Sequence, residues 1–224
     1  MDFLYRLCKQ CLPRAVVSFL RLRRADIPGI RLVARLRDNS TYKDWQRAGR
    51  PVPPPHVVKQ LVIREYQARY SIGTLVETGT FLGEMVIAQR DNFGKIISIE
   101  LSQALYQNAV RMFHSYPHIQ ILQGDSGEVL EAVVPALAER ALFWLDGHYS
   151  GGVTARGKRQ CPILQELEAI FRGNSDHVLL IDDARCFTGA GDYPTVQELS
   201  DFVKARNANY TVEVEDDIIR AVRP

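Results

Sequence analysis

One glycine-containing segment carries residues that could hold a ligand bearing both a carboxylate and an amine. The run Leu75–Glu84 starts as a β-rich stretch and ends where a helical pattern begins, with the spacing E-x-G-x-x-x-G. Gly79 permits a tight turn and close approach of a ligand to the backbone, and Gly83 lets the next helix sit close to a sheet. Unpaired N–H groups at a helix start favour a carboxylate, while Glu77 can hold a cationic amine. Glycines also occur in ordinary strand–helix turns, which is the alternative interpretation.

A second acidic residue indicates a nucleoside. Glu100 ends the next β-rich run, 21 positions after Gly79. A carboxylate at this place can accept hydrogen bonds from both hydroxyls of a ribose. Nicotinamide enzymes use the same device, so Glu100 favours a nucleoside without choosing between cofactors.

Three aspartates follow the next two buried β-rich runs. Asp146 ends Phe143–Asp146, and Asp182 with Asp183 ends Leu179–Asp183. If these strands are neighbours, about 4.8 Å apart, the carboxylates crowd one edge of the sheet and repel one another unless a cation offsets them. A hard divalent ion with oxygen ligands, Mg²⁺ first, is therefore predicted at Asp146, Asp182 and Asp183.

The aspartate pair raises a geometric difficulty. In strand geometry Asp182 and Asp183 point to opposite faces, so both reach an ion only if the strand has already turned into its loop. The alternative is that one aspartate caps a backbone turn while the other is solvated.

His148, two residues after Asp146, is the leading candidate for a general base, because the pKa of imidazole lies near working pH. Catalytic roles are therefore predicted for His148 and Asp146, with an ordinary loop histidine as the alternative. The glycine-rich, basic run 150–159 has the character of a lid over a polar or anionic acceptor.

These residues need a framework of alternating strands and helices. Apolar residues at helical spacing predict a helix over 56–70, and β-rich runs then alternate with helical patterns. Such alternation predicts an α/β protein with a mostly parallel, doubly wound sheet. The strands are expected at 74–77, 95–100, 119–122, 141–146, 178–182, 210–214 and 218–222, and the helices at 83–90, 102–115, 127–139, 160–172 and 194–206.

The end of the chain departs from this alternation. Only Glu215, Asp216 and Asp217 separate the last two strands, which is too short for a parallel crossover. The sequence therefore predicts a seven-stranded sheet that closes with an antiparallel hairpin, unlike the all-parallel dinucleotide-binding fold.

Composition excludes several classes of protein. The 224 residues are 46% hydrophobic and 24% charged, which is typical of a globular chain and not of a disordered or membrane-spanning one. A net charge of +2 gives no general signature of nucleic-acid binding. Four cysteines make no disulfide framework, so a reduced cytoplasmic setting is expected.

The amino-terminal segment carries most of the positive charge. Residues 1–38 hold nine Arg and Lys against three Asp, and the proline-rich connector 51–55 separates this region from the rest. We expect a basic helical extension over 1–50, a connector, and a main domain over 56–224. The extension either packs on the main domain or lies on an anionic membrane surface or a partner.

The loop, the strand-end acids and the terminal hairpin together resemble the class I S-adenosylmethionine (SAM)-dependent methyltransferases. The D-G-H and D-D runs look like those of metal-dependent O-methyltransferases that act on sugars and related hydroxylated molecules. The resemblance implies a Rossmann-like fold, SAM as cofactor, Asp125 and Ser126 beside adenine, and a small hydroxylated acceptor. Asp125 and Ser126 also stand where helix caps are expected. The cofactor contacts expected are Glu77, Gly79, Thr80, Gly83, Glu84, Glu100, Leu101, Ser102, Asp125, Ser126 and Asp146.

Two other functions stay open from the sequence. One is an NAD(P)-dependent Rossmann oxidoreductase, which shares Glu100 but is opposed by the first loop and the hairpin. The other is a SAM-binding or partner-docking protein without turnover, whose functional surface is the basic extension. A homo-oligomer is also left open.

Overall fold

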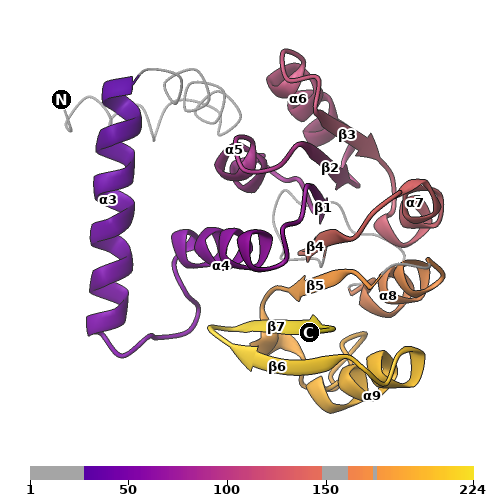
Figure 1. The fold of residues 1–224 in the computed structure, drawn as a ribbon. Coiled ribbons are helices and arrows are strands. Elements are labelled where there is room, and N and C mark those ends of the chain that lie inside the picture. Colours follow the sequence, from indigo (N-terminus) through magenta and orange to yellow (C-terminus); the bar gives the residue numbers. More distant parts are fainter. Residues whose placement is uncertain (1–27, 148–160, 174–175) are drawn as a thin grey trace.

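The computed structural model describes residues 28–147, 161–173 and 176–224, with side chains from residue 36 onward. Figure 1 shows a twisted sheet covered by helices, with one long helix standing apart from it. That helix, α3 (Pro28–Arg47), belongs to the predicted basic extension. Among the described residues, no helix combines the length and the apolar character needed to cross a membrane.

The sheet of the described residues has seven strands in the order β3-β2-β1-β4-β5-β7-β6. The pairs among β1 to β5 are parallel, whereas β7 pairs antiparallel with both β5 and β6. The order reverses between β1 and β4, which is the switch point where open α/β sheets bind ligands. The strands are β1 (Thr74–Thr78), β2 (Lys95–Glu100), β3 (Ile119–Gln123), β4 (Ala141–Leu145), β5 (Val178–Ile181), β6 (Thr211–Glu215) and β7 (Ile218–Val222).

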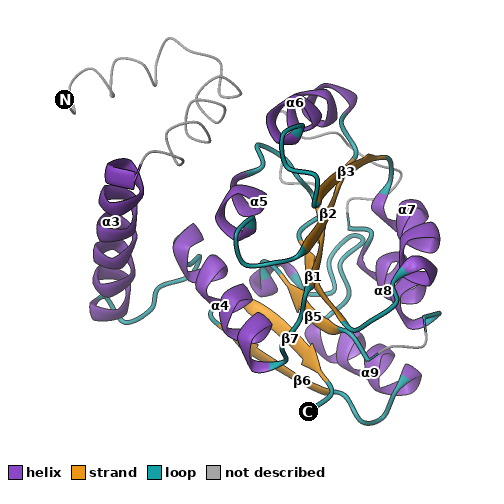
Figure 2. Ribbon diagram, turned by 45° about the horizontal axis from the view of Figure 1, so that its top comes forward, coloured by secondary structure: helices purple, strands orange, loops and turns teal. Residues whose placement is uncertain are grey.

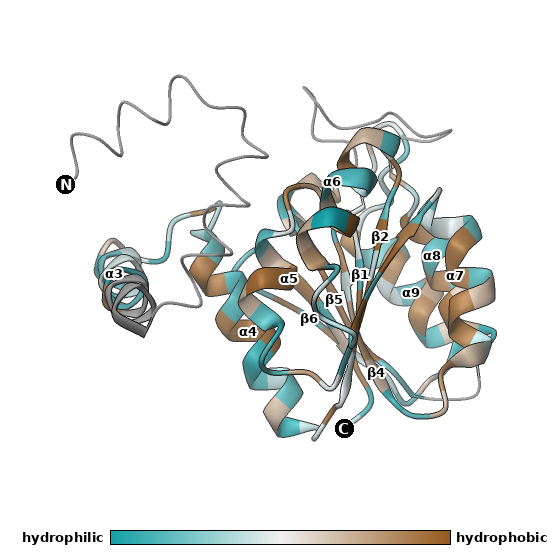
Figure 3. Cartoon of the chain, turned by 90° about the horizontal axis from the view of Figure 1, so that it is seen from above, coloured by the Kyte–Doolittle hydropathy of each residue, from teal (hydrophilic) through white to brown (hydrophobic). Residues whose placement is uncertain are grey.

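Helices cover both faces of this sheet (Figures 2 and 3). On one face lie α4, α5 and α6, and on the other lie α7, α8 and α9. Their bounds are α4 (His56–Arg69), α5 (Glu84–Gln89), α6 (Gln103–Phe113), α7 (Ser126–Val133), α8 (Ile163–Phe171) and α9 (Val196–Arg206), with short 3-10 helices η1 (Val134–Ala136) and η2 (Ala184–Cys186).

The sheet divides the hydrophobic core into two layers because successive strand residues point to opposite faces. In β4, Leu142 and Trp144 pack with α4, α5 and α6, while Phe143 and Leu145 pack with α7, α8 and α9. All four of these side chains are buried. A strand buried on both faces is typical of the centre of a doubly wound sheet.

The terminal hairpin turns through two residues. Glu215 pairs with Ile218, and the intervening Asp216 and Asp217 have φ of 55° and 63°. Two central residues with positive φ are the mark of a type I′ turn, whose twist suits the flanking strands. The predicted hairpin is confirmed, and the predicted strands and helices agree with the observed ones to within a few residues.

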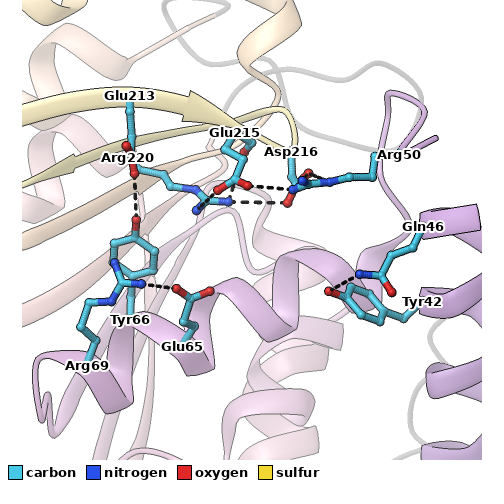
Figure 4. Close-up of polar contacts among 10 residues, drawn as sticks. All are labelled: Tyr42, Gln46, Arg50, Glu65, Tyr66, Arg69, Glu213, Glu215, Asp216 and Arg220. Carbon is cyan, nitrogen blue, oxygen red and sulfur yellow. Dashed lines mark hydrogen bonds and ion pairs between the residues drawn. The ribbon is translucent and has the colours of Figure 1, made fainter.

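The connector after α3 is tied to this hairpin, as Figure 4 shows. The Arg50 guanidinium donates to Asp216 and to Glu215, at 2.9 Å in each case. Trp45 is buried, and its indole N–H donates to the Pro51 carbonyl at 2.9 Å. The end of α3 and the start of the connector therefore have fixed partners, although much of the helix surface from residue 36 is exposed.

Candidate functional site

The glycine loop follows β1 and requires glycine at its first position. Gly79 has φ of 86°, and its N–H donates to the Ile99 carbonyl at 2.9 Å. A Cβ at this residue would stand 2.5 Å from the Asp146 carbonyl oxygen. The loop after β1 and the residue after β4 are thus in direct backbone proximity, which only glycine permits.

The second loop glycine sets the position of α5. Gly83 has φ of 72°, and a Cβ there would lie 2.9 Å from the Phe113 ring of α6. Thr80 is buried, with its hydroxyl 2.6 Å from that of Ser98. Glu84 is the first residue of the six-residue helix α5. Gly83 therefore lies against α6, while the predicted close packing of α5 on the sheet stays a prediction.

Glu77 is buried within β1, beneath this loop. The Ser98 hydroxyl donates to its carboxylate at 2.5 Å. Burial raises the pKa of Glu77 to about 8; the Ser98 bond opposes this shift, and the charges of Asp146 and Glu100 add to it. A cation brought next to this carboxyl would favour its ionised form.

Glu100 joins the end of β2 to the glycine loop. Its carboxylate accepts from the Phe81 N–H at 2.7 Å and from the Ser102 N–H at 2.8 Å. Ser102 also caps α6, where its hydroxyl accepts from the Leu105 N–H at 3.5 Å, and the half-buried Leu101 lies between Glu100 and Ser102 in the chain. The predicted ribose-binding carboxylate is therefore held in a fixed orientation beside the loop.

The residues after β3 have local partners. Asp125 caps α7 by accepting from the Gly127 N–H at 3.1 Å. The buried Ser126 donates its hydroxyl to Glu166 of α8 at 2.5 Å. Capping, the alternative that the sequence left open, is observed for Asp125, and the adenine contacts of both residues stay predictions.

The structure places Asp146 and Asp182 just after the ends of adjacent strands, and Asp183 follows in the chain. Leu145 pairs with Ile181, so Asp146 and Asp182 are the next residues of adjacent strands. The Asp182 N–H donates to the Leu145 carbonyl at 3.1 Å, and Asp183 then turns with φ of 55°. The chain has thus left strand geometry at Asp183, which removes the difficulty raised by alternation.

A residue that sequence reasoning missed, Lys59 of α4, lies between two of these carboxylates. Its ammonium donates to Asp182 and, at 3.3 Å, to Asp183. Burial lowers the pKa of Lys59, but the charges of Asp182, Asp183 and Asp146 outweigh this and raise it above its ordinary value. Lys59 is therefore an ammonium ion that offsets the acidic edge.

The sequence did contain a signal for Lys59. It precedes Val62, Ile63 and Tyr66 by three, four and seven positions, so it shares the buried stripe of α4 with them. A lysine on a buried stripe needs an opposite charge, because an unpaired ammonium is costly to bury. The helix pattern alone did not say which acid would meet it.

These residues do not fit the predicted magnesium ion. Within the described residues, no group of three His, Cys, Asp or Glu side chains is arranged to hold a metal. Asp182 accepts from Lys59 with one oxygen and from the Asp183 N–H, at 2.8 Å, with the other. Asp183 also receives the Arg185 guanidinium at 2.8 Å.

Part of the predicted site lies outside the described residues. His148, the candidate base, and the basic run 150–159 fall in the segment 148–160. Asp146, which is described, is half-buried, and its N–H faces the Thr78 hydroxyl at 3.2 Å. The structure therefore brings Gly79, Glu77 and Asp146 together around the switch point.

Solved structures share this architecture. An O-methyltransferase from Bacillus cereus in complex with S-adenosylhomocysteine (SAH) aligns with a TM-score of 0.54 and 12% identity, covering 83% of this chain and 90% of that one. An O-methyltransferase from Streptomyces achromogenes in complex with SAM aligns with a TM-score of 0.54 and 13% identity, covering 84% and 89%. The chain has the class I methyltransferase fold.

A third structure extends this likeness over the full length. An SAH-bound methyltransferase from Podospora anserina aligns with a TM-score of 0.54 and 14% identity, covering 100% of this chain and 94% of that one. No family model matches the sequence, and no curated protein matches it. The likeness is thus one of fold.

Substituting Gly79 tests the close approach of the loop to β4. We expect Gly79→Ala to lower the free energy of unfolding by at least about 1–2 kcal/mol, because φ is positive and the new Cβ meets the Asp146 carbonyl. Gly73→Ala is the matched control, since a Cβ at Gly73 meets nothing within 4 Å. Denaturant unfolding measures both, and equal stabilities would contradict the geometry.

Burial of Glu77 predicts a pH dependence of stability. Its pKa rises from 4.5 to about 8 on folding, so between these values the folded protein keeps a proton that the unfolded chain loses. Ionisation of Glu77 should therefore lower the free energy of unfolding as pH rises through this window. Glu77→Gln removes that contribution. Relative to the variant, the wild type should lose stability between about pH 5 and pH 8 in denaturant titrations; a constant difference would refute the assignment.

Proposed function

We propose that this chain is a SAM-dependent O-methyltransferase that acts on a small hydroxylated acceptor such as a sugar. The observation that carries the proposal is the hydrogen bond of 2.7 Å between the Phe81 N–H and the Glu100 carboxylate. It joins a glycine loop to a strand-end acid beside the switch point of a class I methyltransferase fold. Two of the similar structures contain SAH and one contains SAM.

The cofactor would be held by groups on adjacent strand ends. Glu77 would face the amine, and the loop of Gly79, Thr80 and Gly83 would hold the amino-acid end, with Glu84 at the start of α5. Glu100 would take the ribose hydroxyls, with each carboxylate oxygen accepting a second hydrogen bond beside the backbone one. Leu101, Ser102, Asp125 and Ser126 would line the nucleoside, and Asp146 would lie beside the sulfur end.

The chemistry needs alignment more than covalent catalysis. Bound SAM supplies a methyl group on a positively charged sulfur. As the acceptor oxygen forms its bond to the methyl carbon, the carbon–sulfur bond breaks and the hydroxyl proton leaves. His148 is proposed to take that proton, and the sheet edge around Asp146 to hold the acceptor in line.

Magnesium assistance stays a prediction from the sequence. The Lys59 ammonium lies between Asp182 and Asp183, so a divalent ion that bound both carboxylates would meet a positive charge there.

The nicotinamide alternative is weaker on structural grounds. Glu100 is compatible with either cofactor, but the antiparallel β7 and β6 at the end of the sheet differ from an all-parallel dinucleotide fold. The loop spacing of Gly79 and Gly83 also differs from the G-x-G-x-x-G that cradles a pyrophosphate. Both features favour SAM.

Ligand binding tests the cofactor. SAH at about 100 times its dissociation constant should raise the free energy of unfolding by about 2.7 kcal/mol, and NAD(H) should not. Glu100→Ala should weaken SAH binding by about 1.5–3 kcal/mol, the scale of hydrogen bonds to a charged group. Calorimetry measures these affinities.

The matched control is Glu131→Ala, which removes an exposed carboxylate of α7 that pairs with Arg172. Its SAH affinity should equal that of the wild type. Protection by NAD(H) without protection by SAH would reject the methyltransferase proposal, and unchanged SAH affinity in Glu100→Ala would reject the ribose assignment.

The role of the basic extension remains a separate proposal. Residues 1–27 lie outside the described residues, so packing on the main domain and contact with an anionic membrane surface both stay predictions. Formation of a homo-oligomer and a cytoplasmic setting are likewise predictions from the sequence.

A further inference from the structure

A lysine of the chain itself, Lys59, places its ammonium at the edge of the sheet beside Asp182 and Asp183. Asp182 is 1% exposed, and the side chain of Lys59 is 15% exposed. The ammonium donates to carboxylates of two successive residues, Asp182 and Asp183. Helix α4 therefore delivers a positive charge to the place where the sequence predicts a metal ion.

This ammonium lies at the edge where methyl transfer is proposed to occur. The Asp182 N–H donates to the Leu145 carbonyl of β4, and the Asp146 N–H donates to the Thr78 carbonyl of β1 at 3.2 Å. Backbone hydrogen bonds thus link the end of β5, through β4, to the start of the glycine loop. Lys59 and the loop share one edge of the sheet.

A divalent ion and this ammonium exclude each other. Magnesium binds oxygen ligands at about 2.0–2.1 Å in octahedral geometry. To contact both Asp182 and Asp183, it would have to stand within a few ångströms of the Lys59 nitrogen, where two positive charges repel strongly. Moving Lys59 away would leave its charge on the buried stripe of α4 beside Val62 and Ile63.

An ammonium can also do part of what a metal does for an acceptor. It has three N–H donors, of which Asp182 and Asp183 accept two. The third can donate to an acceptor oxygen, and a fixed positive charge stabilises that oxygen as its proton leaves.

We propose that Lys59 takes the place of the divalent cation in this site and donates a hydrogen bond to the acceptor oxygen. The inference rests on the proposed function for the acceptor, but the occupancy of the cation position can be tested without SAH or acceptor. The transfer itself is unchanged: the oxygen–carbon bond forms, the sulfur–carbon bond breaks, and the proton goes to the general base.

Manganese binding tests the cation position. After treatment with EDTA and desalting, the full-length wild type is titrated with Mn²⁺ and followed by electron paramagnetic resonance. We expect no stoichiometric binding to the wild type. Lys59→Ala removes the ammonium from Asp182 and Asp183, keeps Arg185 on Asp183, and should bind about one Mn²⁺ per chain. Lys204→Ala, which removes an exposed lysine of α9, should behave as the wild type.

Two results of this titration would overturn the inference. One is stoichiometric Mn²⁺ binding by the wild type that Asp183→Asn abolishes, since the metal would then coexist with Lys59. The other is absence of Mn²⁺ binding in both the wild type and a folded Lys59→Ala variant.

Turnover tests the contact with the acceptor. With an acceptor found by screening, wild-type activity should persist in EDTA. Lys59→Met should reduce kcat about a hundredfold or more while the SAH dissociation constant stays within about twofold. If Lys59→Met does not fold, Lys59→Met combined with Asp182→Asn gives a neutral pair for the same measurement. Unchanged kcat with normal SAH affinity, or loss of wild-type activity in EDTA, would overturn the inference.

These readouts separate the two proposals. Failure of SAH to bind the wild type rejects the methyltransferase function, whatever the Mn²⁺ titration shows. Normal SAH binding together with a wild-type Mn²⁺ site rejects only the role of Lys59.

Discussion

The ion pair of Lys59 with Asp182 and Asp183 ties helix α4 to the end of β5, and the arrangement of the acidic sheet edge depends on it. Removing two charges from water is costly, and the attraction between them repays that cost only when hydrogen bonds satisfy both groups. Asp182 meets this condition, because one oxygen accepts from Lys59 and the other from the Asp183 backbone. Loss of Lys59 would leave the buried Asp182 carboxylate without its ammonium partner.

The other acids at this edge are accommodated in different ways. Glu77 is buried with a pKa of about 8, so a bound proton keeps it largely neutral near pH 7. The Glu100 carboxylate is stabilised by two backbone N–H groups. Asp183 shares Lys59 with Asp182 and also receives Arg185. Each of these carboxyl groups thus has a proton, a backbone N–H or a cationic side chain as its partner.

Ion pairs also stabilise the hairpin of β6 and β7, at the far side of the sheet from β3. The buried Arg220 of β7 pairs with Glu215 at 2.6 Å, and Arg50, directly before the connector, reaches the same hairpin (Figure 4). The exposed pair of Arg50 with Glu215 contributes little stability by itself. It nevertheless gives the connector a defined position relative to β6 and β7, and hence a defined direction of approach to α4.

Local patterns in the sequence determined the framework. The alternation of β-rich and helical runs is a property of neighbouring residues, and so is the short gap between the last two strands. These patterns predicted the seven strands, the succession of strands and helices along the chain, and the hairpin. The two loop glycines were also predictable, because a positive φ and a close approach restrict the residue type at Gly79 and Gly83. Glu100, Asp146 and Asp182 were predictable for another reason. Each stands at the end of a β-rich run, and the carboxyl ends of parallel strands meet at one edge of the sheet.

Only the tertiary structure decided how those acids are neutralised. Lys59 lies 123 positions before Asp182 in the chain, and no local pattern links a lysine of one helix to an aspartate of a distant strand. The sequence showed that the carboxylates needed a positive charge and predicted a metal. The fold brings the Lys59 ammonium to Asp182 and Asp183, because packing the stripe of Val62, Ile63 and Tyr66 on the sheet carries α4 to this edge. Pairing of this kind depends on distance in space, which the spacing of residues along the chain does not encode.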